Sequence, residues 1–157
     1  MNFNTDILTL FDKGWALVTA GDISDFNTMT ISWGGMGTLW GKPVATVYVK
    51  PVRYTHEFME NNDYFTISFF EEEYRKALEL LGSKSGRDCD KVMESRLTPV
   101  RIGENIVGYV QAFRTLVCRK IYSQELDVNA MPEAVREAYY TKEAPHTMYI
   151  GEIVGIG

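Results

Sequence analysis

The stretch NTMTISWGGMGTLWGKPVATVYV, residues 27–49, carries the strongest fold signal in the chain. Residues 27–33 alternate apolar and hydroxyl side chains, which predicts a half-buried strand that presents hydroxyls on its second face. The glycine-rich segment Gly34–Gly41 follows, and Pro43 then starts the β-prone run Val44–Val49. Two strands so close together in sequence indicate a mainly β protein.

The rest of the chain continues this pattern of short strands with a few helices. Further strands are expected at residues 15–20, 64–70 and 147–156, and a hairpin at 100–121 that turns at Gly103-Glu104-Asn105. Helices are expected at 53–61, at 71–81 with Gly82 as the C-cap, and from Pro132 to about Tyr140. About seven strands and three helices, with the strands mostly linked by turns, favour a β-barrel with helices packed outside.

Length and composition exclude several classes of protein. The 157 residues match one domain, and the 45% hydrophobic and 24% charged fractions match an ordinary globular protein. The 21 acidic residues outnumber the 16 basic ones, so the net charge is -5. Because nucleic-acid binders concentrate positive charge, we expect no nucleic-acid partner.

Cysteine usage and the absence of long apolar runs suggest a location. Cys89 and Cys118 lie in no metal-binding or redox spacing, which indicates reduced thiols. No signal peptide is visible at the N-terminus. The longest charge-free run, 26–41, contains four glycines, whereas a membrane span needs about 20 predominantly apolar residues. We expect a cytoplasmic protein without a membrane segment.

Several catalytic and nucleotide motifs fail. A G-x-G-x-x-G motif that starts at Gly35 has Trp40 in place of its last glycine, and Gly41-Lys42 lacks the other residues of a P-loop. There is no G-x-S-x-G sequence to anchor a hydrolase triad. His56 and His146 show no metal-ligand spacing, so we interpret both as partly exposed or hydrogen-bonded histidines and expect no metal.

Three blocks near strand ends combine glycines, hydroxyls and cations, namely residues 27–34, 48–55 and 82–88. A helix that begins near Arg53 presents free N–H groups, to which Arg53 and Thr55 add donors suited to a phosphate. The loop Ser83–Arg87 is a second potential anion-binding turn. The alternative for each block alone is a strand end followed by a solvated loop.

Taken together and in order, these blocks resemble the flavin reductase-like family, in its flavoredoxin-like branch. The resemblance covers roughly residues 13–154 and rests on the segments Asn27–Gly34, Val49–Thr55, Tyr64–Phe69, Ser85–Asp88 and His146–Glu152. It implies a split β-barrel with peripheral helices, and a homodimer that holds FMN near the subunit boundary.

Carried over by position, the resemblance implies two groups of FMN contacts. The isoalloxazine and ribityl side would be lined by Asn27, Thr28, Met29, Thr30, Ser32 and Trp33, although Thr28 stands where many members have alanine. The phosphate would lie at Lys50, Arg53, Tyr54 and Thr55, with Ser83, Ser85 and Arg87 closing over it. His146 is a weak candidate for shaping a nicotinamide site.

The leading hypothesis is therefore an FMN-dependent oxidoreductase. It would take a hydride from NADH or NADPH and pass electrons to free flavin, oxygen or a partner protein, with no catalytic side chain assignable. A second hypothesis is a non-enzymatic FMN-binding module that carries electrons between proteins. A third is a β-barrel that binds another small anion.

Overall fold

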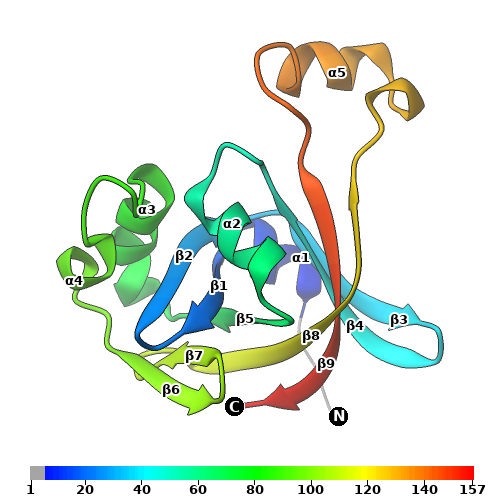
Figure 1. Cartoon of the computed structure of the whole chain (residues 1–157). Coiled ribbons are helices and arrows are strands. Elements are labelled where there is room, and N and C mark those ends of the chain that lie inside the picture. Colours follow the sequence, from blue (N-terminus) through cyan, green and yellow to red (C-terminus); the bar gives the residue numbers. More distant parts are fainter. Residues whose placement is uncertain (1–5) are drawn as a thin grey trace.

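A computed structural model describes residues 6–157 as a mainly β molecule (Figure 1). The strands are β1 (Ala16–Asp22), β2 (Asp25–Ile31), β3 (Gly34–Leu39), β4 (Lys42–Val49), β5 (Tyr64–Phe69), β6 (Pro99–Gly103), β7 (Ile106–Tyr109), β8 (Arg114–Glu125) and β9 (Thr147–Ile156). The helices are α1 (Ile7–Asp12), α2 (Tyr54–Asn61), α3 (Arg75–Ser83), α4 (Lys91–Ser95) and α5 (Glu133–Tyr139), with the short 3₁₀ turns η1 (Glu72–Tyr74) and η2 (Val128–Ala130).

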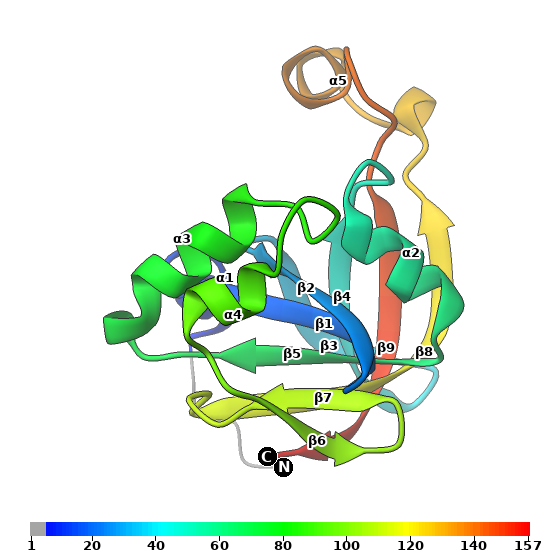
Figure 2. The same ribbon diagram turned by 60° about the vertical axis from the view of Figure 1, so that its left-hand side comes forward.

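Seven strands form one curved antiparallel sheet in the order β2-β1-β5-β8-β9-β4-β3. The two end strands, β2 and β3, are not paired with each other, so the barrel is split along this line. Strands β6 and β7 form a separate ribbon beside β1 and β5 (Figure 2). The expected barrel with peripheral helices is confirmed.

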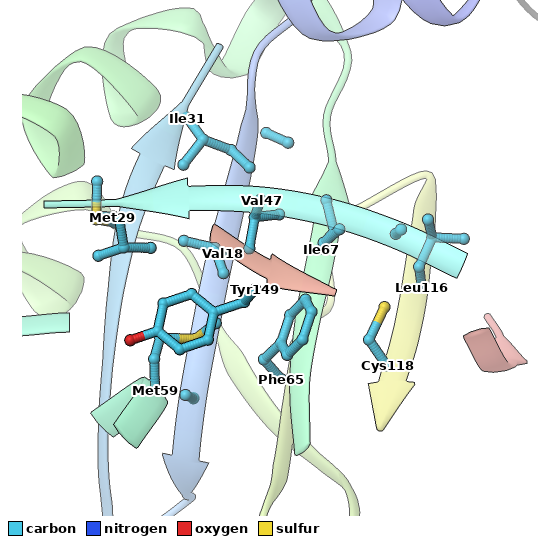
Figure 3. Packing of buried hydrophobic residues seen from close by; sticks show 14 of the residues in the cluster. Val18, Met29, Ile31, Val47, Met59, Phe65, Ile67, Leu116, Cys118 and Tyr149 are labelled. Atoms are coloured by element: carbon cyan, nitrogen blue, oxygen red, sulfur yellow. The ribbon is translucent and has the colours of Figure 1, made fainter. Parts of the chain in front are cut away.

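The main core lies between the two halves of this curved sheet. In Figure 3, Val18 and Ile67 on one side meet Val47 and Tyr149 on the other. These four side chains are fully buried, and burying a large apolar side chain contributes about 1.5–3 kcal/mol. This core is tightly packed at Gly151, where an added Cβ would lie 2.6 Å from the Cβ of Cys118.

A second apolar cluster joins α3 to the outer face of β1. Leu78 and Leu81 of α3 are buried against Leu17. The expected C-cap, Gly82, lies inside α3 rather than after it, so that prediction was wrong. Its position has a packing reason, because a Cβ at Gly82 would stand 3.1 Å from the Cβ of Thr30 on β2. Glycine lets this helix approach the strand closely.

The segment Gly34–Gly41 is the clearest addition to the expected elements. Most of it is the strand β3, which pairs with β4, and Trp40 and Gly41 form the turn with φ of 52° and 70°. Two positive φ values in a two-residue loop are typical of a type I′ hairpin. Since glycine weakens strand propensity, the sequence pattern did not indicate this strand.

The hairpin expected at residues 100–121 is only partly correct. The turn at Glu104-Asn105 is confirmed, but the second arm is divided into β7 and β8, which belong to different sheets. Helices α1 and α4 were not expected. Both are short, and each starts at an aspartate, Asp6 or Asp90, whose carboxylate accepts hydrogen bonds from the first turn.

An arm projects from the barrel. It consists of the outer halves of β8 and β9 and of residues 126–146 between them, which include α5, and it extends beyond the other strands (Figures 1 and 2). No residue of α5 is buried. Within residues 6–157, no helix has the length and apolar character needed to cross a membrane.

Candidate functional site: a cationic cavity at the open edge of the barrel

The first wall of the candidate site is the start of α2. After β4 the chain forms a turn at Pro51, in which the Arg53 N–H donates a hydrogen bond to the Lys50 carbonyl (3.0 Å). Helix α2 then begins at Tyr54. Thr55 is buried in the first turn, and its hydroxyl accepts a hydrogen bond from the Asn27 amide (2.8 Å) on β2. This bond ties the helix start to the free edge of the barrel.

Arg53 is the cation of this wall. Its side chain is half-buried and forms neither an ion pair nor a hydrogen bond with any residue from 6 to 157. Burial lowers the pKa of its guanidinium from the usual value. The five donors of a guanidinium in this setting favour an anionic ligand.

The opposite wall is the segment that joins α3 to α4, which faces α2 on the same side of the barrel (Figure 2). Lys91 opens α4, is only 2% exposed, and donates to the carbonyls of Leu81 (3.1 Å) and Lys84 (3.0 Å). Burial, and secondly the charge of Arg53, lower the pKa of Lys91 to about 8. An ammonium group has three donors, so one remains for a ligand.

These walls enclose a cavity of about 240 Å³, called here the phosphate cavity. Six of the residues expected at the cofactor line it, together with Val52, Gly82, Lys84 and Lys91; the six are Asn27, Arg53, Tyr54, Thr55, Ser83 and Ser85. The lining contains no acidic residue. Buried cations without a carboxylate partner are costly, so the donor set fits a phosphate group that would neutralise them.

Strand β2 leads away from this cavity, and its side chains already form hydrogen bonds or packing contacts within the protein. The buried Thr28 hydroxyl donates to the Val18 carbonyl (3.0 Å), Met29 lies in the main core, and the Thr30 hydroxyl donates to the Leu78 carbonyl. The hydroxyls of Thr28 and Thr30 are therefore not free to contact a flavin ring.

The backbone of β2 offers donors instead. The two-residue loop between Asp22 and Asp25 places the hydrogen bonds to β1 at alternate residues of β2. The N–H and C=O groups of Phe26, Thr28 and Thr30 therefore point towards the unpaired edge. Thr28 is fully buried, so only Phe26 and Thr30, which are partly exposed, can offer these backbone groups to a ligand.

Ser32 and Trp33 lie beyond the far end of β2. With Tyr48 they line a separate cavity of about 510 Å³ next to α1. The Trp33 ring is 47% exposed and stands edge-on to Tyr139 of the arm, with ring centroids 5.4 Å apart. These two residues are thus separate from the phosphate cavity but at the other end of the same strand.

Two expected phosphate residues do not line the phosphate cavity. Lys50 forms an ion pair with Glu143 of the arm (2.9 Å). Arg87 forms an ion pair with Glu57 (2.6 Å) and its guanidinium lies over the Tyr54 ring at 4.8 Å. Each of these two cations therefore has a carboxylate partner that is not part of the cavity lining.

His146 also belongs to the arm. Its Nδ1 shares a hydrogen bond with the Tyr140 hydroxyl (2.8 Å), and its ring lies 5.5 Å from that of Trp33. Burial lowers the pKa of the imidazole. A partly buried, hydrogen-bonded histidine is the interpretation that the sequence favoured.

Lys91 is the site residue that sequence reasoning missed. It lies in the short helix α4, which has too few residues for an apolar period to show. The available signal was Asp90, a helix N-cap residue directly before Lys91-Val92-Met93. Even with the helix assigned, only the packing of α4 against α3 brings Lys91 to Arg53.

The split barrel has a small cavity at its open edge that is lined by cations and by no acidic residue. Such a cavity is suited to an anionic cofactor. The family model described as "Flavin reductase like domain" matches residues 8–157, so the chain belongs to the flavin reductase-like family. This confirms the resemblance read from the sequence. No curated protein matches the sequence significantly.

Solved structures show the same fold at low sequence identity. A flavoredoxin from Methanosarcina acetivorans is 21% identical, with a TM-score of 0.73 over 100% of this chain and 74% of that chain. A flavoredoxin of Desulfovibrio vulgaris is 22% identical, with a TM-score of 0.71 over 100% and 76%. An NADH:FAD oxidoreductase of Streptomyces globisporus is 18% identical, with a TM-score of 0.70 over 92% and 74%.

Proposed function

We propose that this chain is an FMN-dependent oxidoreductase that takes a hydride from NADH or NADPH and passes electrons to free flavin, oxygen or a partner protein. The phosphate cavity is the observation that carries the proposal. Arg53 and Lys91 lie on its two walls, and neither is neutralised by a carboxylate of the lining. Thr55 and Ser85 add hydroxyl groups, whereas the Ser83 hydroxyl donates to the Leu80 carbonyl (3.2 Å). This donor set matches the monophosphate end of FMN.

The residues present divide the work of holding such a cofactor. Arg53 and Lys91 neutralise the phosphate, while Thr55 and Asn27 fix the start of α2 against β2. Strand β2 is an end strand of the sheet, and its partly exposed residues Phe26 and Thr30 can add backbone donors. When bound, FMN supplies the redox chemistry, and the protein supplies orientation and electrostatics.

The test is the visible spectrum of the purified protein, followed by anaerobic titration with NADH and with NADPH. A yellow protein whose flavin absorbance bleaches rapidly on addition of either nucleotide supports the oxidoreductase. Bleaching by a reduced protein partner alone would instead indicate an electron carrier. A colourless protein that does not bind added FMN would contradict the proposal and leave a barrel for another small anion.

A further inference from the structure

The two walls of the phosphate cavity come from separate parts of the chain, and one side chain joins them. The first wall belongs to residues 52–57 at the start of α2, and the second to residues 82–91. Within residues 6–157, every hydrogen bond and ion pair that crosses from one of these segments to the other involves Arg87. The polar contact between the walls therefore depends on a single arginine.

Arg87 contacts the first wall in three ways. One nitrogen of its guanidinium donates to the Val52 carbonyl (3.1 Å), and the other donates to the Glu57 carboxylate (2.6 Å). The guanidinium carbon lies 4.8 Å from the centre of the Tyr54 ring. Because Val52 and Tyr54 both line the phosphate cavity, Arg87 is fixed beside the cavity although it is not part of the lining.

Residues 85–89, which carry Arg87 and reach towards α2 (Figure 2), have few other anchors. None of the five is buried, and in the described part of the chain their remaining hydrogen bonds all go to Ser85 within the same segment. Gly86 lies against the first wall, because a Cβ built on it would stand 2.2 Å from Asn27 Oδ1 and 3.2 Å from the Tyr54 ring. A segment with so few buried contacts opens at a low cost in free energy.

We propose that Arg87 is a latch that holds residues 85–89 closed over the phosphate cavity and thereby sets how fast the cofactor enters and leaves. The inference rests on the proposed function, because it takes the phosphate cavity as the FMN phosphate site. While the latch is closed the phosphate is retained, and when the latch opens the cofactor exchanges with solvent. A latch that is mostly closed makes FMN a resident cofactor rather than a substrate that is exchanged at each turnover.

The charges of the two latch residues alone predict different rates, which makes the proposal testable. If Arg87 acts only by attracting the phosphate, then removing it should slow association. If Glu57 acts only by repelling the phosphate, then neutralising it should slow release. If the two residues form a latch, either change opens the cavity, so association and release both become faster. The dissociation constant, which is the ratio of the two rate constants, then changes less than either of them.

The experiment mixes the apoprotein with FMN in a stopped-flow fluorimeter and follows flavin fluorescence, which gives both rate constants. Arg87→Ala should release FMN about ten-fold faster than wild type, because it loses an exposed ion pair, a hydrogen bond to a carbonyl and a cation–π contact. Glu57→Gln loses only the ion pair, so it should release FMN about two- to five-fold faster. In both variants FMN should also associate faster than with wild type.

Further variants serve as controls and as a rescue. Arg136→Ala and Glu137→Gln make the same changes of charge on α5, whose residues do not line the cavity, and both should match wild type. The exchanged pair Arg87→Glu/Glu57→Arg restores an ion pair between the two positions, so it should release FMN more slowly than Arg87→Ala. A general loss of stability would not be rescued in this way.

Slower association with Arg87→Ala together with slower release from Glu57→Gln would overturn the latch, because both are effects of charge alone. Faster release but slower association with Arg87→Ala would also overturn it, and would assign the guanidinium to the phosphate itself. Unchanged rate constants in both variants would overturn it as well. Failure of wild type to bind FMN at all would be a different result, because it would refute the proposed function itself.

Discussion

Arg53 and Lys91 reach one cavity from two elements that are far apart in the chain, and neither is neutralised there. Arg53→Ala should therefore weaken FMN about ten- to a hundred-fold, because a hydrogen bond with a charged group contributes about 1.5–3 kcal/mol. Riboflavin, which lacks the phosphate, should bind wild type and variant equally. Fluorescence titration with both flavins measures the difference.

Arg136→Ala is the matched control for Arg53→Ala. It also removes an arginine, but Arg136 does not line the cavity and belongs to α5, a helix without buried residues. It should change neither affinity. Equal FMN binding by wild type and Arg53→Ala would place the phosphate elsewhere, and the loop Ser83–Arg87 would be the next site to test.

Lys91 should make FMN binding depend on pH. Its pKa of about 8 lies below the usual lysine value of 10.5, so the free protein loses this positive charge as the pH rises through 8. A bound phosphate favours the charged form, so FMN affinity should fall above pH 8, by up to about ten-fold per pH unit. Between pH 7 and 8 it should be nearly level, since a phosphate has its second pKa at about 6.

Riboflavin serves as the control for this pH profile, because it has no phosphate for Lys91 to contact. Its affinity should stay level over pH 7–9 while that of FMN falls. Parallel profiles for the two flavins would show that Lys91 does not act on the phosphate.

The two cysteines should differ sharply in reactivity. Cys118 is fully buried and burial raises the pKa of its thiol to about 12, whereas Cys89 is partly exposed. A thiol reagent should modify one cysteine in the native protein and two after denaturation. Cys89→Ser and Cys118→Ser should each keep flavin reduction within a few-fold of wild type, and complete loss in either would contradict a structural role.

Among the elements, β9 shows how tightly the barrel is packed. A Cβ at Gly151 would lie 2.6 Å from the Cβ of Cys118 and 2.7 Å from the Phe65 ring. Gly151→Ala should therefore lower the free energy of unfolding by about 1–3 kcal/mol, the usual cost of overpacking a core. Chemical denaturation measures it. Gly37→Ala on β3, where no atom lies within 4 Å of the added Cβ, should be nearly neutral.

The elements with a clear period were predictable from the sequence. Alternation in residues 27–33 and the amphipathic pattern of 71–81 gave β2 and α3 close to their observed places. Strand β3 was not, because its glycines remove the side chains that make a period visible. Arg53 and Thr55, which line the candidate cavity, were among the residues that the sequence singled out. Lys91 was not, because tertiary packing rather than sequence spacing brings it to the same cavity.

At the scale of the whole molecule, one sheet face is left with apolar groups towards solvent. The pairing of β4, β9 and β8 puts Ile150 opposite Thr46 and Tyr122 on the face away from the core. Tyr122 is 36% exposed and lies next to Trp40, which is 64% exposed, with ring centroids 6.4 Å apart. Contiguous exposed apolar groups of this kind are typical of protein–protein contacts.

We therefore expect a homodimer that uses this face, measured by light scattering at micromolar concentration. Ile150→Glu should convert the dimer to a monomer, because two symmetry-related carboxylates would then be buried in an isologous contact. Ile102→Glu on β6 is the matched control, since Ile102 is 46% exposed on the separate ribbon, and this variant should remain a dimer. If the flavin site is shared between subunits, Ile150→Glu should also weaken FMN. A wild-type monomer that binds FMN tightly would refute the shared site, because one copy of the chain would then be sufficient to hold the cofactor.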